Sequence, residues 1–173
     1  GMSEMSGMSA SSNMSKKYDI QAVLFDLDGT VLDTSAGIVR SIKDTIEHFG
    51  LKELPDSELF KFIGPPIEWS FEDKLGCTGE MNKKVSAYFR ERYSNSNLLM
   101  ATPYEGMFEF LKFLKDKGIP TGIATYKKDD YAKRLLCHFD FDKYCTTIHG
   151  SDYENKLTKA DIIELCIQDM KVE

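Results

Sequence analysis

Two aspartates separated by a single residue follow an apolar run near the N-terminus, in the segment Asp26-Leu27-Asp28-Gly29-Thr30. If the chain stays extended there, both carboxylates point the same way, because side chains two residues apart share one face of a strand. Such a pair can attract a divalent cation, or one carboxylate can act as a nucleophile while the other transfers protons. Gly29 permits a sharp turn whose backbone N–H groups can meet an anion. Asp-Gly is also common in ordinary turns, so the spacing alone leaves both interpretations open.

The residues before this pair predict a buried strand. Residues 20–25 are mostly apolar, which is typical of a central strand in a parallel sheet. Ligands of such sheets bind at the carboxyl ends of the strands, where the two aspartates stand. Apolar residues at helical spacing follow, and they predict a helix that Thr34 or Ser35 caps and Gly50 ends.

The rest of the chain divides into a helical stretch and an alternating stretch. Residues 51–103 predict short helices without strands, and the polar residues 94–97 are expected to break the last of them. The elements expected afterwards are a helix over 107–118, a strand over 120–125, a helix over 129–137, a strand over 144–148 and a helix over 159–170. Alternation on both sides of a helical insert predicts an α/β fold, with a parallel sheet and an inserted α-helical domain.

Composition excludes several classes of protein. The 173-residue chain has a formal net charge of −6, so nucleic-acid binding is disfavoured, because no excess of basic residues offsets phosphate repulsion. No apolar run reaches the roughly 18–20 residues that cross a bilayer, and no secretory signal is visible. The four cysteines form no CxxC pair and no zinc-ligand spacing, so we expect reduced thiols. These features predict a cytoplasmic protein without a membrane or nucleic-acid partner, in which residues 1–17 form a disordered tail.

Three segments resemble motifs of the haloacid-dehalogenase-like (HAD) hydrolase superfamily, and they occur in that family's order. Phe25–Thr34 (FDLDGTVLDT) resembles the first motif, Thr125 at the end of an apolar strand resembles the second, and Lys159 at the start of a helix resembles the third. The helical stretch lies where one branch, similar to phosphoglycolate phosphatases, inserts a helical cap. The resemblance implies a Rossmann-like parallel-sheet core and a cap that selects the substrate.

The resemblance also implies a role for each matched residue. Asp26 would attack phosphorus and form an aspartyl-phosphate, while Asp28 would protonate the leaving group and then activate water. Thr125 would donate hydrogen bonds to the phosphoryl oxygens, and Lys159 would offset negative charge beside Asp26. Mg²⁺ is the implied cofactor, bound by a carboxylate oxygen of Asp26 and the backbone carbonyl of Asp28, together with water and further acids.

Further residues of these segments are candidates for binding phosphate or substrate. Gly29 and Thr30, in the first motif, are expected at the phosphate. Lys127 either helps to hold phosphate or is a solvated lysine in a loop. Gly64 and Pro65 resemble the cap loop that faces the active site, although the same residues can form a plain turn between helices.

The family's fourth motif, a pair of acids after a further strand, has no counterpart in the sequence up to Glu173. The expected domains are therefore a core over 18–35 and 104–173, incomplete at its C-terminus, and a complete cap over 36–103. With fewer carboxylates, Mg²⁺ is expected to bind weakly and turnover to be low. The strand over residues 20–25 would then have an open apolar edge, through which two copies could pair.

The predicted function is a Mg²⁺-dependent phosphatase that acts on a small phosphorylated metabolite, phosphoglycolate-like or nucleotide-like. The alternative is a non-catalytic HAD scaffold that binds phosphate or a partner without turnover. A phosphomutase is disfavoured, because Ile38 and Ile67 stand where that branch usually has the His and Arg that hold a second phosphate.

Overall fold

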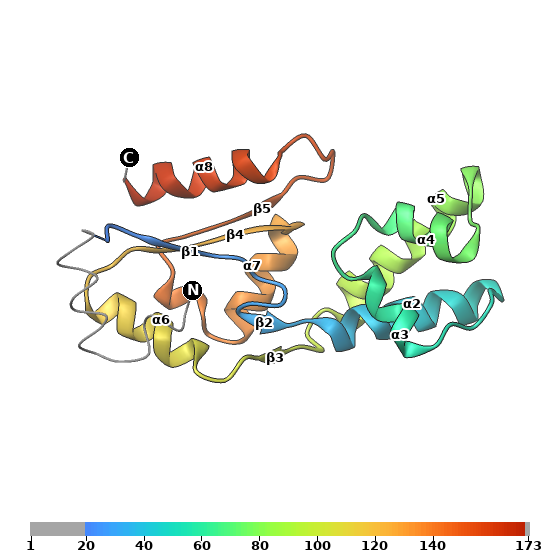
Figure 1. The fold of residues 1–173 in the computed structure, drawn as a ribbon, viewed down its shortest axis with the longest axis horizontal. Helices are drawn as coiled ribbons and strands as arrows, with labels where there is room; N and C mark the ends of the chain where they lie inside the picture. The colour runs from blue at the N-terminus through green and yellow to red at the C-terminus, as the bar shows by residue number, and fades with distance from the viewer. Residues whose placement is uncertain (1–19, 172–173) are drawn as a thin grey trace. The chain divides into compact units, whose positions relative to one another are not determined.

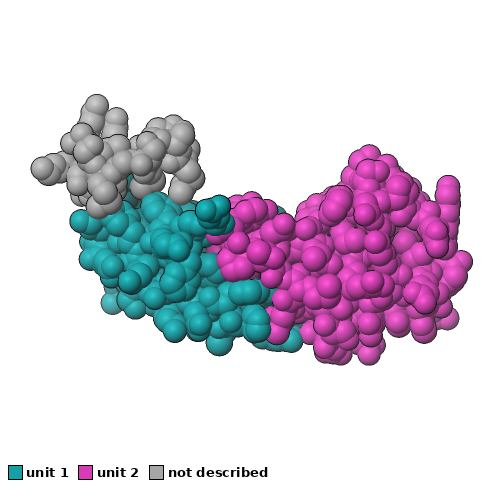
Figure 2. Space-filling model, turned by 90° about the horizontal axis from the view of Figure 1, so that it is seen from below, with its two compact units in different colours: residues 1–27, 105–173 teal, residues 28–104 magenta. Residues whose placement is uncertain are grey.

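The structure, a computed structural model, describes residues 20–171, and the predicted tail over residues 1–17 lies outside the described residues. The chain forms two compact units: the first ends at Leu27 and resumes at Glu105, and the second spans Asp28–Tyr104 (Figure 2). Within residues 20–171, no helix has both the length and the apolar character needed to cross a bilayer. All four cysteines are free thiols.

The first unit is built on a three-stranded parallel sheet with the strand order β1–β4–β5. The strands are β1 (Val23–Phe25), β4 (Thr121–Lys128) and β5 (Thr147–Ser151). The helices are α6 (Met107–Asp116), α7 (Asp129–His138) and α8 (Lys159–Met170), with a 3₁₀ turn, η4 (Asp142–Tyr144), before β5. Figure 1 shows α8 over one face of the sheet and α6 and α7 over the other. The predicted α/β fold with a parallel sheet is confirmed.

Helices cover both faces of this sheet, so apolar side chains on both sides of its strands pack against them. On the α8 face, Ala124 of β4 packs with Ile162, Cys166 and Met170 of α8. On the other face, the ring of Phe25 meets the ring of Phe110 from α6 edge-on, with centroids 5.8 Å apart. This packing holds the carboxyl-terminal halves of the strands in place: Asp26 directly follows β1, and Thr125 lies within the second half of β4.

The strand limits differ from the sequence predictions at three places. β1 covers only three of the six predicted residues, and β4 continues three residues beyond Thr125. β5 begins at Thr147 and not at residue 144, because residues 142–144 form the 3₁₀ turn η4. Within residues 20–171, β1 pairs with β4 alone, so its other edge has no neighbouring strand there. The dimer that was expected to form through this edge stays a prediction.

The second unit consists of helices and one small antiparallel ladder. The helices are α2 (Ser35–Phe49), α3 (Asp56–Leu59), α4 (Ile67–Leu75) and α5 (Gly79–Arg92), with a 3₁₀ turn, η2 (Phe60–Phe62), and a π-helical turn, η3 (Tyr93–Asn97). Gly50 ends α2 in a left-handed conformation with φ of 64°, as predicted. The ladder pairs β2 (Leu32–Asp33) with β3 (Thr102–Pro103), so the expectation of a strand-free segment over 51–103 was wrong. Residues 28–35 are grouped with this second unit, whose two ends the ladder ties together. The predicted division into a core over 18–35 and 104–173 and a cap over 36–103 stays a prediction.

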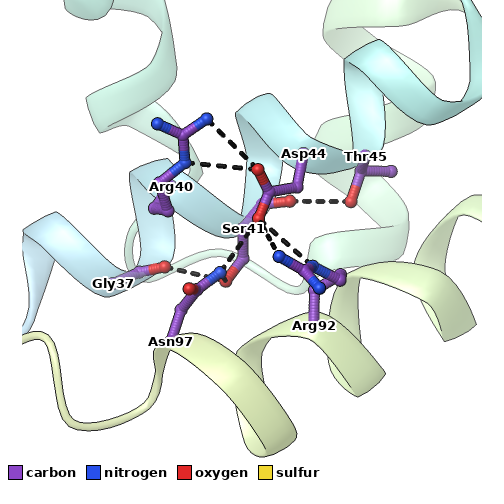
Figure 3. Close-up of polar contacts among 7 residues, drawn as sticks. All are labelled: Gly37, Arg40, Ser41, Asp44, Thr45, Arg92 and Asn97. Carbon is purple, nitrogen blue, oxygen red and sulfur yellow. Dashed lines mark hydrogen bonds and ion pairs between the residues drawn. The ribbon is translucent and has the colours of Figure 1, made fainter.

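A polar network joins α2 to the end of α5 (Figure 3). The carboxylate of Asp44 accepts hydrogen bonds from Arg92 Nη2 at 2.9 Å, from Asn97 Nδ2 at 3.1 Å and from Arg40 Nε at 3.2 Å. Asn97 Nδ2 also donates to the buried Ser41 Oγ at 3.0 Å. Residues 94–97 were expected to break the helix, but these contacts hold Asn97 against α2 and the helix continues as a π turn.

Gly37 lets η3 approach α2 closely. The backbone N–H of Gly37 donates to the carbonyl of Met100 at 3.0 Å. A Cβ atom at position 37 would lie 2.3 Å from the carbonyl oxygen of Asn97, closer than real Cβ contacts. The start of α2 is therefore shaped by a glycine that allows backbone-to-backbone packing.

Candidate active site

Asp26 and Lys159 meet at the carboxyl end of β1, although 133 residues separate them in the sequence. Lys159 Nζ lies 3.3 Å from Asp26 Oδ1, and the side chains are 32% and 51% exposed, respectively. The backbone N–H of Leu27 donates to the same carboxylate oxygen at 2.8 Å. An accessible carboxylate, oriented by a neighbouring backbone N–H and paired with an ammonium group, can act as a nucleophile toward an electrophile such as a phosphoryl group.

Lys159 reaches this place because α8 begins at it. Thr158 caps the helix through its hydroxyl, which accepts from the Asp161 N–H at 3.1 Å, and Asp161 Oδ2 accepts from the Thr158 N–H at 2.9 Å. This capping box is local in sequence, so the start of the helix is set by four consecutive residues. Lys159 Nζ donates in addition to the carbonyl oxygen of Ala124 at 2.8 Å, which fixes the ammonium between β4 and Asp26.

Thr125 lies where the pairing of β4 with β5 becomes irregular. The regular register ends at Ala124 opposite His149 and is shifted when Lys128 pairs with Ser151. Irregular pairing of this kind re-aims side chains at strand ends. Thr125 is buried, and its Oγ1 accepts from the backbone N–H of Lys127 at 3.1 Å. Because the hydroxyl is the acceptor in that bond, its own proton can be donated elsewhere. The structure thus places Thr125 and the backbone of Lys127 together at this strand end.

Asp28 belongs to the second unit and is held there by Thr34. Thr34 Oγ1 donates to Asp28 Oδ1 at 2.6 Å, and Thr34 is buried. The prediction that Thr34 or Ser35 caps α2 through its side chain was therefore wrong, since the Thr34 hydroxyl is directed to Asp28 instead. Asp33 takes over the role of acceptor at the helix start: its Oδ1 accepts from Ser35 Oγ at 2.6 Å and from the Ser35 N–H at 3.0 Å. These two bonds lower the pKa of Asp33.

Gly29 makes the turn after Asp28 with φ of 80°, a conformation that favours glycine. Its backbone N–H donates to the carbonyl oxygen of Leu32 at 2.9 Å, and Thr30 is exposed. The N–H of Gly29 is thus paired inside the turn and would have to leave Leu32 before it could meet an anion. The expected phosphate contacts of Gly29 and Thr30 stay predictions.

Comparison with known proteins agrees with this arrangement of residues. The family described as haloacid dehalogenase-like hydrolase matches residues 23–173, a range that contains all three predicted motifs. The chain belongs to the HAD-like hydrolases.

Individual relatives share most of this chain. It is 32% identical over 139 residues to a 5'-nucleotidase of Pseudomonas aeruginosa, covering 80% of this chain and 63% of the relative. It is 30% identical over 145 residues to the tyrosine-protein kinase PtkA of Mycobacterium tuberculosis, covering 83% of this chain and 49% of the relative. A solved HAD-like hydrolase from Streptococcus pneumoniae superposes with a TM-score of 0.81 at 26% identity, covering 90% of this chain and 72% of that one. The chain therefore spans about half to two thirds of the length of these curated relatives.

Two predicted residues of the HAD cap loop, Gly64 and Pro65, lie in the second unit, in an exposed turn just before α4. Gly64 has φ of 111°, which a residue with a side chain rarely adopts. A turn of this shape is compatible with either interpretation of the loop, and the role of these two residues in substrate binding stays a prediction.

Oxygen ligands suited to Mg²⁺ are present, although few. Within residues 20–171, no group of three or more His, Cys, Asp or Glu side chains is close enough to hold a metal ion. The half-exposed carboxylate of Asp26 and the oxygens of Asp28 are hard donors of the kind that Mg²⁺ takes. Mg²⁺ commonly keeps several waters and binds through one or two carboxylates plus substrate phosphate. These donor types suit this ion, and magnesium as the cofactor stays a prediction.

Three contacts of the site escaped the sequence analysis. They are the bond from Thr34 to Asp28, the bond from Lys159 Nζ to the carbonyl of Ala124, and the contact of Lys159 with Tyr126. Tyr126 stands next to Thr125 in the sequence, so its position at the strand end was visible. Its partner was not, because that contact joins residues 33 positions apart.

Proposed function

We propose that this HAD-like chain forms the phosphoryl-transfer site of a phosphatase that hydrolyses a small phosphate monoester through an aspartyl-phosphate on Asp26. The observation that carries the proposal is the pairing of Lys159 Nζ with Asp26 Oδ1 at 3.3 Å at the carboxyl end of the parallel sheet. The name of the Pseudomonas relative, a 5'-nucleotidase, supports a phosphate monoester as the substrate class.

In the first half-reaction, a carboxylate oxygen of Asp26 attacks phosphorus and the bond from phosphorus to the ester oxygen breaks. Asp28 gives its proton to the departing oxygen, so the product leaves as an alcohol. Positioned proton donors of this kind contribute typically about 10²–10⁴-fold in rate. The Thr34 hydroxyl, 2.6 Å from Asp28 Oδ1, orients the proton-transferring carboxyl group.

In the second half-reaction, Asp28 removes a proton from water, and the water oxygen attacks the phosphorus of the aspartyl-phosphate. The bond from phosphorus to Asp26 breaks, which releases inorganic phosphate and restores both carboxyl groups. Lys159 and Thr125 act in both halves: the ammonium offsets the negative charges of Asp26 and phosphate, and the hydroxyl donates to a phosphoryl oxygen.

Magnesium is the cofactor that fits this chemistry. Asp26 and the backbone carbonyl of Asp28 would hold it, together with waters and the substrate phosphate. When bound, the ion supplies positive charge that lowers the repulsion between the carboxylate nucleophile and the phosphate.

The names of the relatives, which include a 5'-nucleotidase and a phosphoglycolate phosphatase, support the substrate class. A phosphoglycolate-like or nucleotide-like monoester is the proposed substrate, and the second unit is the proposed cap that selects it. A non-catalytic scaffold that binds phosphate without turnover is the competing function.

Substitution of Asp26 tests the proposal. The 173-residue protein and its Asp26→Asn variant are assayed with p-nitrophenyl phosphate and Mg²⁺, with Asp116→Asn as the matched control. Asp116 is an exposed aspartate at the end of α6, on the same unit. We expect Asp26→Asn to lose hydrolysis by at least about 10³-fold, because an amide cannot form the acyl phosphate. The control is expected to retain full activity.

Two outcomes would contradict the proposal. Equal activity in the wild type and Asp26→Asn would show that the hydrolysis does not use this nucleophile. Binding of inorganic phosphate without hydrolysis in the wild type would favour the scaffold.

A further inference from the structure

We propose that Tyr126 is a positioning residue for Lys159: its hydroxyl anchors the backbone of Lys159, and its ring guides the ammonium toward Asp26. This role rests on the proposed phosphate site at Asp26. Tyr126 follows Thr125 directly, so one dipeptide at the irregular end of β4 would supply a phosphate-binding hydroxyl and the support for the neighbouring lysine.

The hydroxyl of Tyr126 satisfies a donor that α8 cannot satisfy itself. The first N–H groups of a helix have no partner within the helix. In α8 the capping box pairs the N–H of Asp161 with Thr158 Oγ1, but Lys159, the first helical residue, needs an acceptor from outside. Tyr126 Oη accepts from the Lys159 N–H at 3.0 Å. The contact therefore ties the start of α8 to the end of β4.

The ring of Tyr126 acts on the other end of the same residue. Lys159 Nζ lies 5.7 Å from the centre of that ring, within the range in which an ammonium is attracted to an aromatic face. The ammonium also donates to the Ala124 carbonyl at 2.8 Å and lies 3.3 Å from Asp26 Oδ1. Three neighbours thus restrict the side chain of Lys159, which would be flexible without them.

Burial does not account for Tyr126. Its side chain is 60% exposed, among the most exposed of the large apolar or aromatic residues in the described part of the chain. An exposed ring contributes little to the stability of the core. The ring and the hydroxyl of Tyr126 both contact Lys159, so they affect the position of its ammonium group. Preorganising a charged donor in this way improves anion binding, because less side-chain freedom is lost when the anion arrives.

The test separates the hydroxyl from the ring. Tyr126→Phe keeps the ring and removes the acceptor, and Tyr126→Leu removes both. Tyr153→Phe is the matched control, since Tyr153 is equally exposed at 61% and donates its hydroxyl to Asp130 at 2.7 Å. Its ring also lies near an ammonium, that of Lys128, at 5.6 Å. The control thus loses the same chemical group from a similar setting.

Two measurements on the full chain report the contact and its consequence. Amide hydrogen exchange at Lys159, followed by NMR, is expected to speed up about tenfold in Tyr126→Phe and to stay unchanged in Tyr153→Phe. Binding of inorganic phosphate, measured by calorimetry, is expected to weaken about threefold in Tyr126→Phe and about tenfold in Tyr126→Leu. In a Lys159→Met background, neither substitution should weaken phosphate binding further, because the residue that Tyr126 positions is gone.

The outcomes distinguish this role from the phosphatase proposal. Unchanged Lys159 exchange in Tyr126→Phe would overturn the positioning role even if Asp26-dependent hydrolysis is found. An equal loss of phosphate binding with and without Lys159 would overturn it as well, since Tyr126 would then act independently. Faster exchange together with Lys159-dependent phosphate binding would support it even if the protein proves to be a scaffold without turnover.

Discussion

Replacing Asp44 with asparagine is expected to destabilise the helical unit by about 2 kcal/mol, a factor of about 30 in the ratio of folded to unfolded chains. The Asp44 side chain is 15% exposed, so its charge is largely withdrawn from water and depends on its partners. Those partners donate from Arg92 at 2.9 Å and Asn97 at 3.1 Å (Figure 3). A hydrogen bond to a charged group contributes about 1.5–3 kcal/mol. The cost of burying Asp44 and the 39% exposure of Arg92 reduce the total to about one such bond.

Urea denaturation followed by the fluorescence of Trp69 measures this loss. Trp69 is the only tryptophan of the chain, and it lies on α4 in the same unit as Asp44. Asp56→Asn is the matched control, because its carboxylate meets Lys43 Nζ at 3.3 Å with both side chains well exposed, at 66% and 46%. We expect this exposed pair to contribute about 0.5 kcal/mol or less.

The loss in free energy of unfolding should therefore be clearly larger for Asp44→Asn than for Asp56→Asn. A loss for Asp44→Asn that is no larger than the loss for Asp56→Asn would refute a stabilising role of the buried network. A large loss for both variants would instead indicate that aspartate charge in general supports the unit.

Two further outcomes are expected from the same titration. Burial is the largest single influence on the pKa of Asp44 and raises it, but hydrogen bonds from Arg92, Asn97 and Arg40 together outweigh burial and hold the pKa below its ordinary value. A lowered folded pKa adds stability above the unfolded value, and this is lost as pH falls through the folded value. The wild type and Asp44→Asn should therefore converge below about pH 4; a difference that widens in acid would contradict this. Gly37→Ala should lower the urea midpoint, because its Cβ would lie 2.3 Å from the carbonyl oxygen of Asn97. This clash is expected to outweigh the helix propensity of alanine, which favours the helix by about 1 kcal/mol. A higher midpoint would show that α2 and η3 can move apart without cost.

Features with local causes were predicted well from the sequence. The start of α8 at Lys159 depends on the capping box between Thr158 and Asp161, and the end of α2 depends on the left-handed Gly50. The parallel sheet follows from short apolar runs that alternate with helical patterns. Each of these signals lies within a few consecutive residues, so no knowledge of distant contacts was needed.

Features with distant causes were missed. The ladder of β2 with β3 joins residues about 70 positions apart and has two residues a side, too short for a pattern of alternating hydrophobicity. The π turn at residues 93–97 runs through a polar segment that looks like a helix breaker. It persists because Asn97 is held by Ser41 and Asp44, on another helix.

By itself, the sequence determined which chemical groups stand at the candidate site and in which order they occur along the chain. They are the carboxylates of Asp26 and Asp28, the hydroxyl of Thr125 and the ammonium of Lys159. Only the tertiary structure decided which atoms meet. It placed Lys159 beside Asp26, directed the Thr34 hydroxyl to Asp28 and set Tyr126 against Lys159. The physical reason is that residue type fixes what a group can donate, accept or carry as charge, whereas its partner depends on where folding brings the ends of strands and helices together.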